Sequence, residues 1–116
     1  MQRPAVRDAL ASPPMGPIFL HLCVRVSRER RADFLAFLRE AVPYYEASGG
    51  ILIRLLERRD DPEELIEVVE YASRGDYERD QQRVEHDPEM QSYLRRWREL
   101  LMEPPRVIVW DEQAVR

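Results

Sequence analysis

The sequence contains no lysine, no asparagine and no threonine, and its single cysteine is Cys23. Without lysine the protein cannot form a Schiff base with a substrate. One cysteine excludes an intrachain disulfide and a cysteine-based zinc site. The two histidines, His21 and His86, lie too far apart for the spacing of a metal site. We therefore expect neither a metal nor a cofactor.

An excess of positive charge and a long apolar run are also missing. Eighteen basic residues, all of them arginine, face 22 acidic ones, for a net charge of −4, whereas nucleic-acid binding depends on a basic face. The longest apolar stretch, residues 18–24, is far shorter than the roughly 20 residues that cross a bilayer. No apolar leader with a small-residue cleavage site opens the sequence. We expect a cytoplasmic protein with neither nucleic acid nor a membrane as its partner.

Proline divides the chain into two parts. Residues 1–17 hold four of the nine prolines, and proline lacks a backbone donor and disfavours helix in the residue before it. This segment is predicted to be a flexible N-terminal arm. The remainder, residues 18–116, has the length of a single domain.

Apolar spacing predicts an α+β fold with the element order βαββαβ. Alternation with period two indicates strands at residues 18–27, 51–59, 65–72 and 106–111, and helical spacing indicates helices at 28–47 and from 73 to about 102. Pro43 should kink or interrupt the first helix, and Asp87-Pro88 should break the second. Asp80 and Arg83 are expected as an ion pair on the solvent side of that second helical region. The order is ferredoxin-like, and right-handed crossovers predict an antiparallel sheet of order 4-1-3-2 with both helices on one face.

The sheet face without helices is predicted to be apolar. It would carry Phe19, Cys23, Leu52, Leu56, Ile66, Val68, Ile108 and Trp110. Soluble monomers rarely expose so large a patch, so we expect a homodimer in which two copies pack sheet against sheet.

Charged residues lie on the same face. Because buried charges need partners, Arg25, Glu70 and Arg54 are interpreted as a three-residue bridge at the dimer interface, beside Trp110. A structural role is the simpler interpretation of this bridge, and a catalytic role is the alternative.

Several short stretches resemble known families. The likeness to the NIPSNAP-like branch of the dimeric α+β barrel proteins rests on Tyr71-Ala72-Ser73, residues 86–94, residues 106–110, Pro43 and Gly49-Gly50. The run Glu70-Tyr71-Ala72-Ser73 is similar to the Glu-aromatic-x-Ser signature of the antibiotic-biosynthesis-monooxygenase-like (ABM-like) group. The resemblance covers about residues 18–111 and implies a dimeric α+β barrel with a pocket between sheet and helices in each subunit.

The resemblance also implies a range of activities. Some relatives oxidise aromatic phenols with oxygen and no cofactor, others degrade haem or small aromatics, and others have no known activity. This sequence departs from those patterns, because it has no asparagine and has Tyr71 where tryptophan is common. His86 is the one histidine after Tyr71 in the sequence. It lies further along the chain than the axial histidine of the haem-degrading relatives, so the sequence disfavours haem binding.

Tyr71 and His21 are the candidate catalytic residues. The Tyr71 phenol can donate a hydrogen bond to a bound carbonyl or phenolate, and an imidazole such as His21 is suited to deprotonating a phenol near neutral pH. Structural alternatives remain open for both: a core tyrosine, and a histidine that bonds across the dimer.

Tyr44, Tyr45 and Trp97 are the candidate substrate-binding residues. The two tyrosines follow Pro43, where a pocket mouth could open, and Trp97 lies on the apolar side of the second helical region; packing is the alternative for all three. Two functions therefore stay open. One is a cofactor-independent monooxygenase acting on a small aromatic or hydrophobic substrate. The other is a non-catalytic homodimeric protein that binds a small molecule or serves as an accessory, which the lack of a compact acid–base constellation favours.

Overall fold

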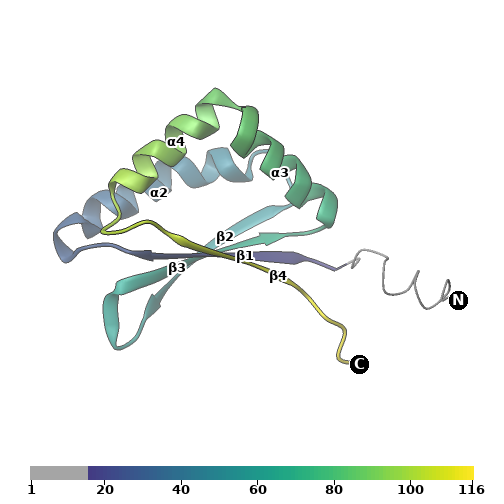
Figure 1. Cartoon of the computed structure of the whole chain (residues 1–116), viewed down its shortest axis with the longest axis horizontal. Coiled ribbons are helices and arrows are strands. Elements are labelled where there is room, and N and C mark those ends of the chain that lie inside the picture. The colour runs from purple at the N-terminus through teal and green to yellow at the C-terminus, as the bar shows by residue number, and fades with distance from the viewer. Residues whose placement is uncertain (1–15) are drawn as a thin grey trace, which may run out of the picture.

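The computed structural model describes residues 16–116, so the arm predicted for residues 1–17 lies almost wholly outside the described residues. The described chain forms one four-stranded sheet of order β2-β3-β1-β4 in which all neighbouring strands are antiparallel. Its helices lie above one face of the sheet (Figure 1). This is the predicted 4-1-3-2 order counted from the opposite edge, and the ferredoxin-like βαββαβ prediction is confirmed.

The strands are β1 (Ile18–Arg25), β2 (Ile51–Arg58), β3 (Asp61–Tyr71) and β4 (Arg106–Asp111). The third strand begins at Asp61, earlier than the expected residue 65. The strand therefore includes Asp61, Glu63 and Glu64, and the pairing of β2 with β3 shifts register at Glu57/Arg58. Within this extension Asp61 pairs with Arg25 of β1, and Glu64 pairs with Arg58 of β2.

The helices are a 3-10 turn η1 (Arg28–Arg30), α2 (Arg31–Glu46), α3 (Arg74–His86) and α4 (Pro88–Glu99). The helix α2 runs through Pro43 without interruption, because a proline in the last turn removes one hydrogen bond near an end that frays anyway. The predicted break before Pro88 is confirmed. Asp87 is extended, and its side chain accepts a hydrogen bond from the Glu89 N–H, which caps α4.

Two glycines lead the chain from α2 into β2. Gly49 and Gly50 have φ values of 86° and 73°, a left-handed conformation that glycine adopts without strain. A Cβ atom on Gly50 would collide with the carboxylate of Asp76 in the first turn of α3. The close approach fixes the start of α3 against the end of the sheet, which places the rest of α3 over β3.

The core lies between the helices and the inner face of the sheet. One cluster contains Phe34, Phe37, Leu38 and Ala41 of α2 packed on Val24, Val26 and Leu65, and it includes Trp97. A smaller cluster contains Ile18, Val69 and Tyr71. Two acidic residues are buried in the same layer, Glu67 and Asp80, whose exposed fractions are 2% and 8%.

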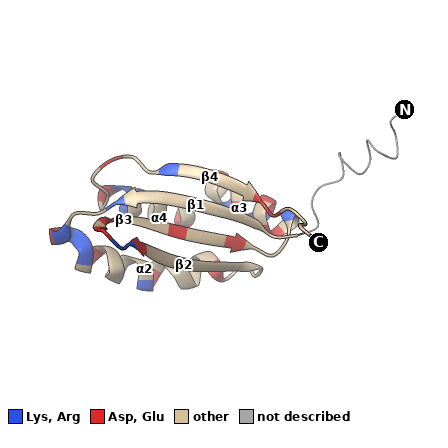
Figure 2. Cartoon of the chain, turned by 90° about the horizontal axis from the view of Figure 1, so that it is seen from below, with Lys and Arg blue, Asp and Glu red and all other residues tan. Residues whose placement is uncertain are grey.

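No described helix lies over the outer face of the sheet, which is the face seen in Figure 2. Leu52, Leu56 and Trp110 are 46%, 53% and 50% exposed there, and Cys23 on β1 is half-buried. The His21 ring lies 5.7 Å from that of Trp110, centroid to centroid. The predicted apolar face is therefore present, and the homodimer that would cover it stays a prediction.

Candidate functional site

A cavity of about 250 Å³ lies between the inner face of the sheet and the two C-terminal helices. Most of its wall is apolar. It is lined by Leu20, Leu22, Val69 and Tyr71 from the central strands, Val107 from β4, Asp80, Gln81 and Val84 from α3, and Met90, Leu94, Trp97 and Arg98 from α4. A concave apolar site with a few polar groups is the usual form of a small-molecule site. We call it the sheet–helix pocket.

Tyr71 and Asp80 form the polar centre of this pocket. Tyr71 ends β3, and strand alternation turns its side chain towards the helices. Its hydroxyl donates a hydrogen bond of 2.5 Å to Oδ2 of Asp80, and both residues are buried. The helix α3 therefore presents a carboxylate to the pocket at the point where the strand ends.

The orientation of α3 corrects one prediction. Asp80 and Arg83 do form the expected pair, at 3.5 Å, but on the inner side of the helix rather than in solvent. Arg83 also donates to the backbone carbonyls of Tyr44 and Tyr45 at the end of α2. These bonds across two helices draw that side of α3 inward, a tertiary effect that helical spacing alone does not reveal.

The pocket environment sets the protonation of this pair. Burial raises the pKa of Asp80, while the hydrogen bond from Tyr71 and the charge of Arg83 act to lower it. Burial and the contact with Asp80 raise the pKa of the Tyr71 phenol. Tyr71 is therefore a hydrogen-bond donor at neutral pH, and Asp80 is an acceptor whose basicity exceeds that of an exposed aspartate.

A second buried carboxyl, Glu67, lies beside the pocket. It shares the inner face of β3 with Tyr71, and the indole Nε1–H of Trp97 donates to its Oε2 at 2.5 Å. Burial raises the pKa of Glu67 to about 7, although the Trp97 bond opposes the rise. No described arginine forms an ion pair with it. Glu67 was not among the predicted site residues, yet alternation along β3 places it on the inner face between Leu65 and Val69.

The two tyrosines predicted to bind substrate do not line the pocket, whereas Trp97 does. Tyr44 donates a hydrogen bond to Asp87, and its ring stacks beneath the Arg83 guanidinium at 4.9 Å. The Tyr45 hydroxyl is buried and has no hydrogen-bond partner among the described residues. Both tyrosines hold the end of α2 against α3 and α4, behind the pocket wall.

The structure does not bring His21 to Tyr71. His21 alternates with Leu20 and Leu22, which line the pocket, so its side chain lies on the outer face of the sheet, beside Trp110. Within one chain the two catalytic candidates are therefore on opposite faces. A role for His21 stays a prediction that concerns the outer face.

The predicted three-residue bridge on the outer face is half right. Arg54 and Glu70 approach to 3.5 Å. Arg25 is wrong as a partner of Glu70, because antiparallel pairing places Arg25 opposite Glu64 and Glu70 opposite Phe19. That these residues and Trp110 lie in a dimer interface is untested and stays a prediction.

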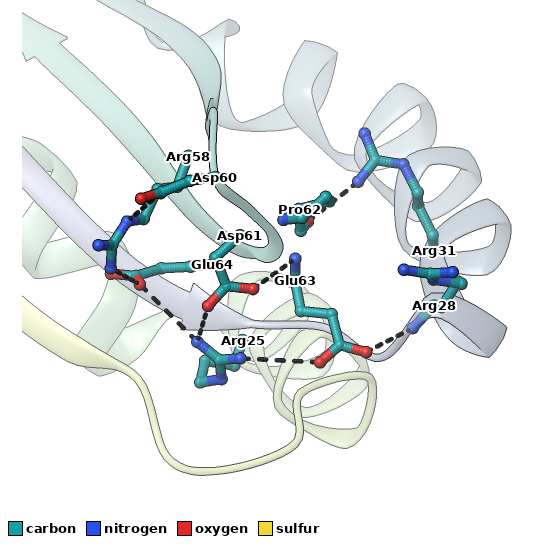
Figure 3. A network of polar contacts seen from close by, with 9 residues as sticks. All are labelled: Arg25, Arg28, Arg31, Arg58, Asp60, Asp61, Pro62, Glu63 and Glu64. Carbon is teal, nitrogen blue, oxygen red and sulfur yellow. Dashed lines mark hydrogen bonds and ion pairs between the residues drawn. The ribbon is translucent and has the colours of Figure 1, made fainter.

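Arg25 instead belongs to a group of charges at the β2–β3 hairpin (Figure 3). Its guanidinium lies 3.0 Å from Asp61, 3.7 Å from Glu63 and 3.7 Å from Glu64, and Arg58 pairs with Glu64 at 2.9 Å. The Arg25 contact lowers the pKa of Asp61. We call these five residues the hairpin charge cluster.

Metal ligands and membrane-spanning helices are two further features that concern residues 16–116, the described part of the chain. That part of the chain holds no group of three or more histidine, cysteine, aspartate or glutamate residues that could bind a metal ion. None of its helices is long and apolar enough to cross a membrane.

The fold is that of the antibiotic biosynthesis monooxygenase proteins. A putative antibiotic biosynthesis monooxygenase from Bordetella bronchiseptica superposes with a TM-score of 0.69 at 22% identity, over 85% of this chain and 99% of that chain. A protein from Mycobacterium tuberculosis gives 0.67 at 23% identity, over 85% and 97%. The likeness to this group is therefore shown at the level of fold.

One similar structure has a named activity. SnoaB from Streptomyces nogalater, described as a cofactor-independent oxygenase, superposes with a TM-score of 0.69 at 12% identity, over 86% of this chain and 96% of that chain. The sequence matches no family model and no curated protein. Membership of the NIPSNAP-like branch stays a prediction.

Proposed function

We propose that the protein is a monooxygenase that uses no cofactor and oxidises a small aromatic substrate in the sheet–helix pocket. The observation that carries the proposal is the buried Tyr71–Asp80 pair, which places a hydrogen-bond donor and a basic carboxylate inside an apolar cavity. The fold it shares with a cofactor-independent oxygenase supports the same reaction class. A pocket that served binding alone would not require a buried carboxylate, which costs free energy to desolvate.

The roles of the two residues follow from their chemistry. Asp80 accepts a proton from the hydroxyl group or the activated CH₂ of the substrate. Its carboxyl is then neutral, so the Tyr71 hydroxyl turns from Asp80 and donates its one hydrogen bond to the substrate anion, which it stabilises. The electron-rich anion reduces dioxygen and combines with it to give a hydroperoxide. Loss of water then yields the carbonyl product, so that RH₂ + O₂ gives R=O + H₂O. The proton held by Asp80 returns to the departing oxygen, and the substrate supplies all the electrons.

The size of the pocket limits the substrate. Its volume of about 250 Å³ lies just below the range of roughly 300–1,000 Å³ that is common for ligand sites. Apolar walls favour a neutral hydrocarbon body, and Asp80 favours a ligand that carries a hydrogen-bond donor. Small phenols and anthrone-like compounds are therefore the substrate class.

A homodimer is part of the proposal, as is the cytoplasmic location expected from the sequence. The exposed apolar residues Leu52, Leu56 and Trp110 on the outer face support sheet-on-sheet pairing. Light scattering after size exclusion measures the mass, and we expect twice the chain mass of 13.8 kDa. A mass near 14 kDa at micromolar concentration would contradict the dimer.

Oxygen consumption tests the activity. The purified protein is mixed with a panel of anthrone-like compounds and quinols, and oxygen uptake and the labelled-oxygen content of the product are measured. Asp80→Asn should lower the rate by about 10²-fold or more, because it removes the base, and Tyr71→Phe should lower it by a smaller factor. Glu78→Gln, an exposed change on the same helix, is the matched control.

The outcomes are distinct. Uptake that depends on Asp80 and Tyr71 supports the proposal. Absence of uptake across the whole panel, or uptake unchanged in Asp80→Asn, would overturn it.

A further inference from the structure

The group that the proposed reaction leaves unused is Glu67, a carboxyl whose residue is only 2% exposed. It lies next to the pocket without being part of the lining. Its cross-strand neighbour Leu22, its partner Trp97 and the next inner-face residue Val69 all line the cavity. The Trp97 indole therefore stands between the Glu67 carboxyl and the ligand space.

The charged and titratable groups around Glu67 come from three helices. From α2 comes the Tyr45 phenol, whose pKa is raised first by burial and then by the charge of Glu67, with a smaller contribution from Asp80. From α3 come Asp80 and Arg83, which pair with each other. From α4, Trp97 donates the hydrogen bond, Tyr93 packs on Tyr45, Arg96 is held by Glu40, and Arg98 lines the pocket. The neighbours on β1 and β2, Leu22 and Leu55, are apolar.

The two buried carboxyls thus have unequal surroundings. Asp80 has a guanidinium and a phenol donor, both of which favour its ionised form. Glu67 has one neutral N–H and no cation of its own among the described residues. Where two carboxyls share a site, such a difference separates their roles.

We propose that Glu67 is a positioning residue that acts through Trp97, and that the pocket binds an anionic ligand more tightly while the Glu67 carboxyl is protonated. This inference rests on the proposed function, since the anion formed by proton transfer to Asp80 is the ligand state that matters. A second buried negative charge beside the pocket would repel that anion, and the low dielectric of the interior strengthens the repulsion. Neutral Glu67 keeps its carbonyl oxygen as the acceptor for Trp97, so the pocket wall stays in place.

Burial raises the pKa of Glu67 to about 7, and this value sets the pH at which the affinity for an anion changes. Anion binding and oxygenase rate should both decline as pH rises through that value. A neutral ligand should show no such decline. Glu67→Gln keeps the acceptor oxygen and removes the ionisation, so it should behave at high pH as the wild type does at low pH.

Ligand binding tests the charge effect. Calorimetry at pH 5.5 and 8.5 compares 2-naphthoate, an anion at both values, with neutral 2-naphthol. We expect the wild-type affinity for 2-naphthoate to fall on the order of tenfold at the higher pH, with 2-naphthol unchanged. Glu67→Gln should abolish the fall, and the exposed control Glu78→Gln should retain it. Equal 2-naphthoate affinity at both pH values in the wild type, or a fall that persists in Glu67→Gln, would overturn the proposal.

Tryptophan fluorescence tests the Glu67–Trp97 link without a ligand. Trp110→Phe leaves Trp97 as the one indole of the chain, and its emission is followed from pH 5 to 9. We expect a transition near pH 7 that disappears when Glu67→Gln is added; a flat titration, or one that survives the substitution, would overturn the link. Absence of oxygen uptake together with an intact transition and intact naphthoate behaviour would overturn the monooxygenase and leave the role of Glu67 standing.

Discussion

One strand, β3, carries two kinds of carboxylate. At its start, Asp61, Glu63 and Glu64 belong to the hairpin charge cluster, where each side chain is about a third exposed and lies within ion-pair distance of Arg25. Further along, Glu67 is buried under Trp97, and no described arginine forms an ion pair with it. The pKa of Asp61 is lowered, chiefly by the hydrogen bond from Arg25, while burial raises that of Glu67.

The difference shows which carboxylates maintain shape and which are available for chemistry. Exposed ion pairs exchange one set of solvated partners for another, so each contributes little. A buried carboxyl has lost its water, so its proton affinity and its few contacts become sensitive to any change. Substitutions in the two regions should therefore change the free energy of unfolding by different amounts. The larger changes are expected in the interior and the smaller ones in the hairpin charge cluster.

The largest effect is expected for Trp97→Ala. Trp97 is 5% exposed in the main core cluster, so truncation creates a cavity and also leaves Glu67 without its donor. We expect a loss of about 3–5 kcal/mol in the free energy of unfolding, measured by chemical denaturation. Trp97→Phe, which keeps most of the ring volume, should lose less. A loss below about 1 kcal/mol for Trp97→Ala would mean that this region is not packed as described.

Next in size is the pH dependence that Glu67 imposes on stability. Its pKa rises from 4.5 when unfolded to about 7 when folded, so the folded state binds the proton more tightly. The stabilisation is complete below pH 4.5 and is lost as pH rises through 7, a change of about 3 kcal/mol at 1.4 kcal/mol per unit. Glu67→Gln should flatten this part of the curve.

Asp61 provides the contrast within the same strand. Its folded pKa is lowered, so its contribution is present above its unfolded pKa and is lost as pH falls through the folded value. Asp61→Asn should therefore alter the free energy of unfolding only at the acid end of the pH range. Denaturation curves collected from pH 3 to 9 measure both variants, and an unchanged slope between pH 4.5 and 7 in Glu67→Gln would contradict the assignment.

A smaller loss is expected for Tyr71→Phe. The ring stays in the core, but the carboxylate of Asp80 loses the hydrogen bond of 2.5 Å, and hydrogen bonds to charged groups contribute about 1.5–3 kcal/mol. Tyr77→Phe is the matched control, since its ring packs on Tyr71 at 5.2 Å and its hydroxyl bonds to no described residue. Thermal denaturation compares the two, and equal losses would show that the buried hydroxyl has no special role.

The smallest effect is expected in the hairpin charge cluster. Arg58→Ala removes the contacts with Asp60 and Glu64, whose partners stay in water. The midpoint of thermal unfolding should change less than in any of the interior variants, and the change should fade in about 1 M salt, which screens exposed pairs. A loss as large as that of Tyr71→Phe would remove the distinction between the two regions.

Much of the fold could be predicted because each element carries its own signal. Alternation marked the strands, the prolines and glycines marked their limits, and the chain order with right-handed crossovers fixed the sheet. The misplacement of Arg25 had a geometric cause. The first and third strands are antiparallel, so the end of one meets the beginning of the other, and Arg25 could reach Glu64 but never Glu70.

The site was harder to predict, since its polar centre depends on how helices pack. Tyr71 and Trp97 were found by type and position. Asp80 is one acid among several on a helix with few apolar residues, and only the bonds from Arg83 to the end of α2 show which side faces inward. Glu67 did have a sequence signal, because it is an acidic residue at a position of β3 that faces the helices.

The single thiol of Cys23, half-buried on the uncovered side of β1, is a specific site for attaching a spin label. A nitroxide attached there needs no prior removal of other cysteines, because the chain has one. An isolated chain would then yield no dipolar coupling between spins, whereas two chains related by a two-fold axis would yield one sharp inter-spin distance.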